Sequence, residues 1–302
     1  MIVNKNITKI IDFSECKFSK RNGSYGGNAG TKEGIIYNND KWLIKYPKKL
    51  KGLTNVDMDY STAPLSEYIG SKIYKILGYD VHEVMLGEKN NKIVVACKDF
   101  CTDGKELQEL RTIKNVHNEK LSQMLDETIS STSDSHKIEI DEVLVHLKYN
   151  PILKDISDLK DRFWDMMVID CFIANNDRNN GNWGLLVDDS GYHLAPVFDN
   201  GSSFNNRASD NKLTKIMSNE KNFIGTEINQ LTIYSKNEHA LTAKKLLSLW
   251  EKYPDLADAL KRNYPLIKNN MDAINKMIDS IPIRIKGWKL FLIYEKSITK
   301  TA

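Results

Sequence analysis

Apolar and polar residues alternate along several short stretches in the first third of the chain, and a period of two predicts β-strands. Asn-rich turns at 38–40 and 90–91 separate neighbouring stretches, which predicts two hairpins. We therefore expect a small sheet near the N-terminus. The predicted strands cover residues 7–13, 34–37, 42–46, 81–88 and 92–97.

The period of an α-helix appears at residues 64–77, where Pro64 suits the first turn, and then dominates the chain beyond residue 98. Helix 158–174 is apolar over much of its circumference, so we expect it at the centre of its domain. The other predicted helices cover residues 105–126, 138–149, 240–252, 254–262, 266–280 and 285–296.

These patterns predict an α+β protein with two lobes. Residues 1–98 would form a small β-rich lobe, and residues 99–302 a larger, mainly helical one. The linker 98–104, which contains Lys98 and Phe100, would join them. Residues 205–237 are polar and are expected to face a substrate.

Composition narrows the class of protein without identifying it. A chain of 302 residues fits a two-lobed domain, and a net charge of +3 argues against nucleic acid as a direct substrate. The basic C-terminal forty residues are interpreted as a solvated helix face, with a polyanion-binding patch as the alternative.

The four cysteines have no zinc-binding spacing and fit a reducing cytosol. The N-terminus is too polar for a signal peptide, and no apolar run reaches the roughly 18 residues that span a membrane. We expect a cytoplasmic protein, and export by a route without a signal peptide stays open.

Residues 23–30 contain four glycines, which disfavour a helix or strand interior but let backbone N–H groups approach a phosphate. The pattern lacks the Lys-Ser/Thr ending of a Walker loop, and a glycine-rich surface turn is the alternative. The candidate phosphate-contacting residues are Gly26, Gly27, Asn28, Ala29, Gly30 and Lys32.

Lys45 lies inside an otherwise apolar strand, where a lysine needs a partner or a ligand. It could be an edge-strand lysine in water, but the glycine loop just upstream favours an ammonium aimed at ATP phosphates. Glu67, near the start of helix 64–77, could pair with Lys45. The alternative for Glu67 is a helix-dipole acid, and the two readings are about equally supported.

The stretch from residue 172 to 204 carries the strongest candidate chemistry. Asp177 follows the apolar helix, Asn182 lies five residues on, a predicted hairpin comes next, and Asp199 precedes Asn200-Gly201. Asp177 could orient a substrate hydroxyl and accept its proton, while Asn182 and Asp199 offer the oxygen ligands that Mg²⁺ prefers. A calcium or turn cluster involving Asp188 is the alternative, although no EF-hand spacing is present.

Four segments, YGGNAGTK, WLIKYP, NNDRNNGNWG and VFDNGSSF, resemble the HipA-like kinase family, the toxin kinases of bacterial toxin–antitoxin systems. The resemblance implies a protein-kinase-like fold, ATP and Mg²⁺ as cofactors, serine/threonine protein substrates and a possible antitoxin partner. The adenine of ATP would lie beneath the linker that contains Lys98 and Phe100. About twenty residues precede the glycine loop, so the chain resembles short forms without the extra N-terminal subdomain.

The resemblance also implies autophosphorylation of a serine in the glycine loop, which would displace the loop from ATP. Ser24 is the candidate, with Thr31, Ser202 and Ser203 as rivals.

The sequence departs from ordinary protein kinases in ways that keep other functions open. Asn175-Asn176 replaces His-Arg before Asp177, and Asn200 replaces the Phe of Asp-Phe-Gly. Arg178 is a candidate cation for the transferring phosphoryl group. NNDRNNGN also resembles phosphoinositide-kinase loops, so a lipid or small-molecule kinase stays an alternative. A non-catalytic nucleotide-binding or antitoxin-binding module is the other.

Overall fold

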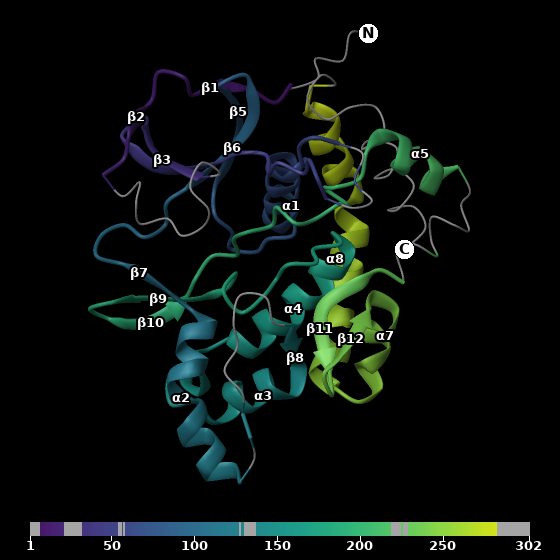
Figure 1. The fold of residues 1–302 in the computed structure, drawn as a ribbon. Helices are drawn as coiled ribbons and strands as arrows, with labels where there is room; N and C mark the ends of the chain where they lie inside the picture. Colours follow the sequence, from purple (N-terminus) through teal and green to yellow (C-terminus); the bar gives the residue numbers. More distant parts are fainter. Residues whose placement is uncertain are drawn as a thin grey trace. The chain divides into compact units, whose positions relative to one another are not determined.

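A computed structural model describes residues 7–20, 32–53, 56, 58–126, 128–129, 137–218, 225 and 229–282. The chain divides into two compact units. The first contains Met1–Asp99, Asn200–Glu227 and Tyr264–Ala302, and the second contains Phe100–Asp199 and Ile228–Asn263. Figure 1 shows the elements of both.

The first segment of the first unit ends at Asp99, and the same unit also includes the segment after Asp199. Hydrogen bonds account for this grouping, because Ser66 Oγ donates to the carbonyl of Ser203 and Thr62 N–H donates to that of Asn206. The division into lobes at 98/99 stays a prediction.

A six-stranded sheet forms the frame of the first unit, with strand order β1-β5-β6-β4-β3-β2. It curls strongly in Figure 1. Its β1–β5 pair is parallel and its other pairs are antiparallel. The strands are β1 (Ile11–Asp12), β2 (Lys17–Phe18), β3 (Lys32–Tyr37), β4 (Asp40–Lys45), β5 (Val84–Lys89) and β6 (Lys92–Lys98).

Both predicted hairpins form at two-residue Asn-Asn turns. Asn38 and Asn39 have φ of 51° and 67°, and Asn90 and Asn91 have φ of 53° and 56°. Such turns need positive φ at both central residues, which Asn tolerates better than most residues. The turns therefore fix the register in which Lys32 lies opposite Lys45.

Apolar side chains cover both faces of the curled sheet. One face carries a buried apolar cluster, and most of its side chains are completely inaccessible to water. Its members are Phe13, Ile35, Trp42, Ile44, Val94 and Ala96. On the other, α1 (Ala63–Ile76) packs against β5 and β6, with Leu65, Ile69 and Ile73 buried. A prolyl residue in its first turn starts the helix as predicted.

The second unit is built around α4 (Leu159–Phe172), which is buried along most of its length, as its apolar circumference predicts. Around it lie α2 (Leu110–Leu125), α3 (Ile140–Tyr149) and the short 3-10 helix η2 (Leu153–Asp155). The hairpin predicted after Asn182 is present as β9 (Gly184–Asp188) and β10 (Gly191–Leu194).

Two predicted helices begin as strands instead. Residues Glu106–Glu109 form β7 because they pair with β9, in a sheet of order β10-β9-β7. Ile138–Glu139 forms β8, which pairs with β11 (Leu231–Lys236), and β12 (His239–Thr242) completes that sheet. Pairing with a distant strand outweighs local periodicity at these positions.

The C-terminal helices differ from their predicted bounds. Residues Ala243–Leu247 form α7, Ser248–Glu251 form η3, and Pro254–Ser280 form one helix, α8, although Pro265 lies inside it. The predicted break at 263–265 is therefore absent, at the cost of one backbone hydrogen bond that proline cannot make. Helix α5 (Asp210–Met217) occupies part of the predicted polar stretch. The predicted helix 285–296 lies outside the described residues.

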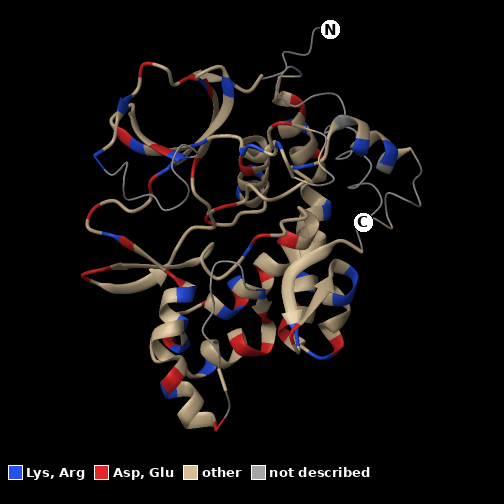
Figure 2. Ribbon diagram, in the orientation of Figure 1, with Lys and Arg blue, Asp and Glu red and all other residues tan. Residues whose placement is uncertain are grey.

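Acidic and basic residues alternate along the described parts of both units, as the colours of the ribbon in Figure 2 show, which agrees with the small net charge. Across the described ranges, none of the helices combines the length and apolar character needed to cross a membrane.

Candidate active site

The predicted pair of Lys45 and Glu67 is formed in the first unit. Lys45 Nζ lies 2.7 Å from Glu67 Oε2, with the lysine side chain 16% exposed and the glutamate side chain 1% exposed. Strand β4 directs Lys45 to the face of the sheet that α1 covers, and Glu67 lies in the second turn of α1. The lysine is therefore neither an edge residue in water nor an unpaired buried charge.

Glu67 receives three different donors. His82 Nε2 lies 3.0 Å from Oε1, and the backbone N–H of Asn200 donates to the same oxygen at 2.9 Å. Burial by itself would raise the pKa of Glu67, but the charge of Lys45 and the hydrogen bond from His82 hold it below its usual range. Glu67 is thus an ionised, fully buried carboxylate, and it lies outside the first turn of α1, where the helix-dipole alternative would place it.

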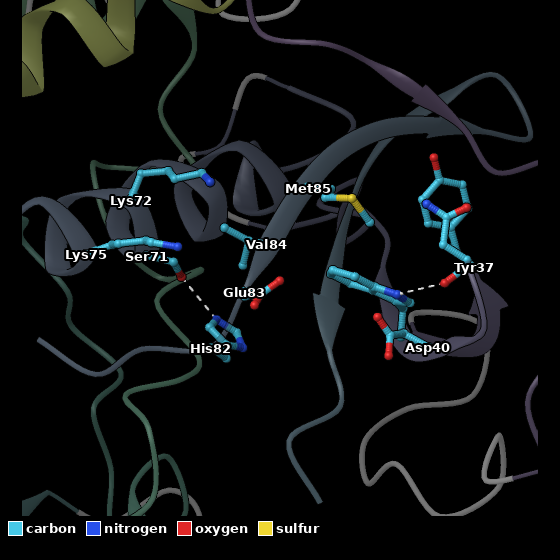
Figure 3. Close-up of a pocket in the computed structure, with 11 residues that line it drawn as sticks. Tyr37, Asp40, Ser71, Lys72, Lys75, His82, Glu83, Val84 and Met85 are labelled. Carbon is cyan, nitrogen blue, oxygen red and sulfur yellow. Dashed lines mark hydrogen bonds between the residues drawn. The ribbon is translucent and has the colours of Figure 1, made fainter. Parts of the chain in front are cut away.

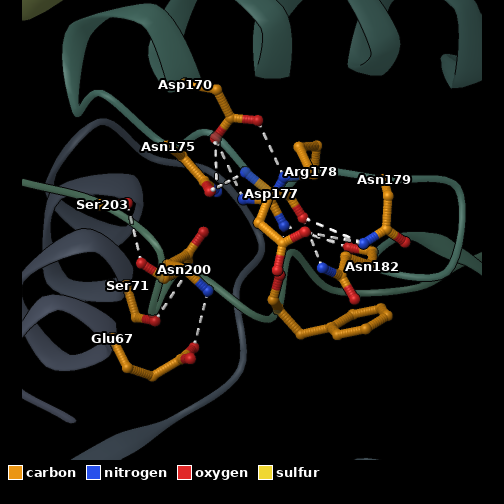
Figure 4. A network of polar contacts seen from close by, with 11 residues as sticks. Glu67, Ser71, Asp170, Asn175, Asp177, Arg178, Asn179, Asn182, Asn200 and Ser203 are labelled. Carbon is orange, nitrogen blue, oxygen red and sulfur yellow. Dashed lines mark hydrogen bonds and ion pairs between the residues drawn. The ribbon is translucent and has the colours of Figure 1, made fainter. Parts of the chain in front are cut away.

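Asn200, the residue that follows Asp199, is held by hydrogen bonds to helix α1. Its backbone N–H binds Glu67, and its Nδ2 donates to Ser71 Oγ at 3.0 Å (Figure 4). Gly70 permits this close approach, since a Cβ there would lie 2.8 Å from the Asn200 Cβ. A buried amide with specific hydrogen bonds therefore occupies the position where Asp-Phe-Gly kinases have an aromatic ring.

Local hydrogen bonds hold the predicted catalytic loop of the second unit (Figure 4). The Asn175 side chain accepts from the N–H of Asp177 at 3.2 Å, and Asn179 Nδ2 donates to Asp177 Oδ1 at 3.1 Å. Asn182 Nδ2 donates to the Asp177 carbonyl at 2.6 Å. The asparagines of NNDRNNGN thus fix the loop that carries the half-buried Asp177.

Asn182 and Asp199 have the chemistry expected of Mg²⁺ ligands. The amide nitrogen of Asn182 is used by the Asp177 carbonyl, which leaves Oδ1 as the hard oxygen available to a cation. Asp199 has φ of 59°, a left-handed conformation that non-glycine residues adopt rarely and that concentrates at functional sites. The donor set therefore fits Mg²⁺.

The structure contradicts the role predicted for Arg178. Its side chain is fully buried, and its guanidinium binds both carboxylate oxygens of Asp170, at 2.9 and 3.1 Å. Nη1 also donates to the carbonyls of Asn182, at 3.1 Å, and of Phe198. Arg178 therefore positions the Asn182 loop and the segment before Asp199, and it does not face a transferring phosphoryl group.

The calcium alternative also lacks support. Asp188 Oδ1 accepts from Ser190 N–H at 2.8 Å and closes its own hairpin turn. Within the described ranges, Glu67, His82 and Cys97 are the group of potential metal ligands whose atoms lie within 4.8 Å of one another, and Asp188, Asp189 and Asp199 do not form such a group.

Some of the remaining predicted nucleotide contacts lie within the described residues, and the others lie outside them. Lys98 Nζ pairs with Asp40 at 2.9 Å, and Phe100 packs on Phe198 with ring centroids 5.6 Å apart, next to Asp199. Lys32 lies in β3 opposite Lys45. Gly26, Gly27, Asn28, Ala29, Gly30 and the autophosphorylation candidates Ser24 and Thr31 lie outside the described residues.

Sequence reasoning missed three residues that organise the site. His82 and Ser71 bind Glu67 and Asn200 across the first unit, and no local pattern marks them. Asp170 carried a signal, because an acid within the apolar helix 158–174 must have a partner. Its partner, Arg178, follows eight residues later.

A buried lysine–glutamate pair, an Asp–Asn loop and an acid before Asn-Gly are the parts that a protein-kinase-like phosphotransferase requires. Residues 27–281 match the family of HipA-like C-terminal domains. The match spans most of the chain, so the protein belongs to this family, and the predicted resemblance is confirmed.

The chain is 34% identical over 286 residues to the serine/threonine-protein kinase CtkA of Helicobacter pylori (strain J99), which covers 93% of this chain and 82% of that protein. The crystal structure of an H. pylori proinflammatory kinase CtkA superposes with a TM-score of 0.79 at 31% identity, over 97% of this chain and 95% of that one. HipA of Shewanella oneidensis MR-1, solved with HipB and operator DNA, is similar in fold, with a TM-score of 0.53 at 11% identity over 96% and 72% of the chains. The predicted α+β, kinase-like fold is therefore confirmed.

Proposed function

We propose that this HipA-like serine/threonine kinase transfers the γ-phosphoryl group of ATP to a hydroxyl group of a protein. The observation that carries the proposal is the Lys45–Glu67 ion pair at 2.7 Å, whose carboxylate also binds the backbone of the residue after Asp199. An ion pair of this kind is required for phosphoryl transfer in protein kinases. A nucleotide-binding module without catalysis would not need Asp177 and its supporting loop.

Each residue would contribute one part of the reaction. Lys45, fixed by Glu67, would bind phosphate oxygens as a point charge. Asp177 would orient the substrate hydroxyl and accept its proton, and its loop bonds hold the carboxylate for that task. Arg178 would hold the catalytic loop and the segment that leads to Asp199 through the carbonyls of Asn182 and Phe198.

Asn182 and Asp199 would hold Mg²⁺ through amide and carboxylate oxygens. When bound, the ion supplies positive charge against the phosphate oxygens of the nucleotide. The anchoring of Asn200 by Glu67 and Ser71 would keep Asp199 oriented for this ligation.

The name of the H. pylori relative and the family match support serine or threonine on a protein as the acceptor. Autophosphorylation at Ser24 and regulation by an antitoxin-type protein remain proposals that follow from family membership. Intact-mass measurement after incubation with Mg-ATP tests the first, and a mass without added phosphate in active enzyme would contradict it.

The test is transfer of γ-labelled phosphate from ATP to protein in a cell lysate, with purified wild-type protein and Asp177→Ala. Loss of the general base predicts a rate lower by about 100-fold or more. The neighbouring exposed Asn176→Ala is the matched control and should label close to wild type. Equal labelling by wild type and Asp177→Ala would overturn the catalytic assignment, and label extracted into the organic phase would indicate a lipid kinase.

A further inference from the structure

A pocket of about 250 Å³ lies in the first unit, and neither Lys45 nor Asp199 lines it. Helix α1 contributes Lys72 and Lys75, strand β5 contributes Val84 and Met85, and the β3–β4 hairpin contributes Trp42. Figure 3 shows Lys72, Lys75, Val84 and Met85 among the side chains that line the pocket. The volume is small for a drug-sized ligand and fits a single ring system with one short substituent.

Among the described residues, no carboxylate forms an ion pair with the lysine side chains of the pocket. Lys72 and Lys75 lie one helical turn apart, and neither forms an ion pair within 4.0 Å with any of the residues that the structure describes. The Lys72 ammonium lies 5.3 Å from the centre of the Tyr68 ring, and burial, followed by the charge of Lys75, lowers its pKa. Two adjacent ammonium groups in a recess favour a bound anion.

The acids that line the pocket do not neutralise these lysines. Asp40 pairs with Lys98 at 2.9 Å, outside the lysine cluster. Glu83 is exposed and acts on Lys72 only through longer-range attraction. The exposed Lys75 also lies in the last turn of α1, where a cation is favourable, but that position does not supply a partner for Lys72.

Apolar side chains form the rest of the wall. Trp42 is 5% exposed, and its Nε1 donates to the carbonyl of Tyr37 at 3.3 Å, so the indole is fixed. Val84 is buried beside it, and Met85 supplies an adaptable thioether. A fixed indole, a methionine and two ammonium groups together suit a ligand with a flat apolar body and one negative charge.

The pocket wall is shared with the network that holds Glu67. His82 and Ser71 both line the pocket. His82 Nε2 lies 3.0 Å from Ser71 Oγ and 3.0 Å from Glu67 Oε1, and Ser71 in turn accepts from Asn200. A molecule that restrains His82 and Ser71 from the pocket side therefore acts directly on the partners of Glu67.

We propose that this pocket binds a small organic anion with a planar apolar body, and that its occupant controls phosphoryl transfer through His82 and Glu67. The regulatory part rests on the proposed kinase function, whereas the binding part does not. An occupied pocket holds His82 against Glu67 and so maintains the Lys45–Glu67 pair.

Binding is tested with indole-3-acetate as the probe and the full chain as the target. Indole-3-ethanol, which has the same body without the charge, is the matched ligand control, and calorimetric titration with saturation-transfer NMR gives the readout. We expect saturable binding of the acid that weakens by about tenfold or more in Lys72→Gln/Lys75→Gln and is unchanged in the exposed Lys120→Gln. Equal binding of both ligands, unchanged binding in the double variant, or no saturable binding at millimolar acid would overturn the site.

Regulation is tested by the rate of label transfer with saturating indole-3-acetate or indole-3-ethanol. We expect the acid to raise the wild-type rate by about twofold or more, and to leave the rate of His82→Leu unchanged while still binding to that variant. An unchanged wild-type rate at saturation would overturn the regulatory part. An inactive wild-type protein would instead refute the kinase proposal, and the calorimetric result would stand independently.

Discussion

The candidate site residues of the first unit and those of the second are held in place in different ways. In the second unit, asparagines within a few residues of Asp177 fix the loop by bonds to their own neighbours. In the first unit, Glu67 and Asn200 are 133 residues apart in sequence and meet through a buried hydrogen bond. A network of residues that are close in sequence can be recognised as a short motif. The members of a network between distant residues cannot be recognised from sequence alone.

The two networks also differ in the kind of charge they bury. Arg178 and Asp170 form a closed pair in the second unit, with side chains 0% and 1% exposed. Lys45 and Glu67 form a pair whose lysine retains some exposure, at 16%, and can reach a ligand. A fully buried ion pair stabilises the fold, so substituting it should mainly lower the free energy of unfolding. A partly exposed pair can contact a ligand, so substituting it should mainly lower the rate of phosphoryl transfer.

Arg178→Met is expected to have the largest effect and to act on stability. Removing the guanidinium leaves Asp170 buried without its partner, which costs about 3–5 kcal/mol. Urea unfolding measures the change, with the exposed Arg207→Met as the matched control. The double variant Asp170→Leu/Arg178→Met should recover part of the loss, and a single variant as stable as wild type would contradict the positioning role.

Lys45→Met is expected to act on activity more than on stability. Glu67 keeps His82 and Asn200 as donors, but the charge that binds phosphate is lost, which predicts a labelling rate lower by about 100-fold. The exposed Lys41→Met on the same strand is the control and should retain the wild-type rate. A wild-type labelling rate in Lys45→Met would show that phosphoryl transfer does not depend on the Lys45–Glu67 ion pair.

Glu67→Gln is expected to have the smallest effect, lowering the free energy of unfolding by about 1–2 kcal/mol at neutral pH. The pH dependence of this loss tests whether Glu67 is ionised. Because the folded-state pKa of Glu67 lies below its ordinary value of 4.5, the ionised carboxylate contributes stability above that pH. This contribution is lost as pH falls below about 4.5 toward the lower folded pKa. Unfolding free energies of wild type and variant should therefore converge in acid. A difference in unfolding free energy that stays constant at every pH would contradict an ionised Glu67. The control is Glu106→Gln, which replaces an exposed glutamate.

Much of the fold followed from local patterns. The hairpins at Asn38-Asn39 and Asn90-Asn91 formed as predicted because turn residues with positive φ set their register. Local periodicity predicts helix at the residues that form strands β7 and β8. Their pairing partners, β9 and β11, lie far away in sequence, so the local pattern does not indicate the pairing. The helix expected to break near Pro265 continues, since packing along α8 outweighs one lost hydrogen bond.

The sequence by itself determined the family, the kinase-like fold and the residue types of the site, because spacing within NNDRNNGN and VFDN is a property of a short segment. Tertiary structure alone decided that Glu67 pairs with Lys45 and holds Asn200, and that Arg178 faces inward to Asp170. It also decided that His82 joins the Glu67 network to a pocket with two lysines that form no ion pair among the described residues. The physical reason is that burial and partner choice depend on which distant segments the folded chain brings together.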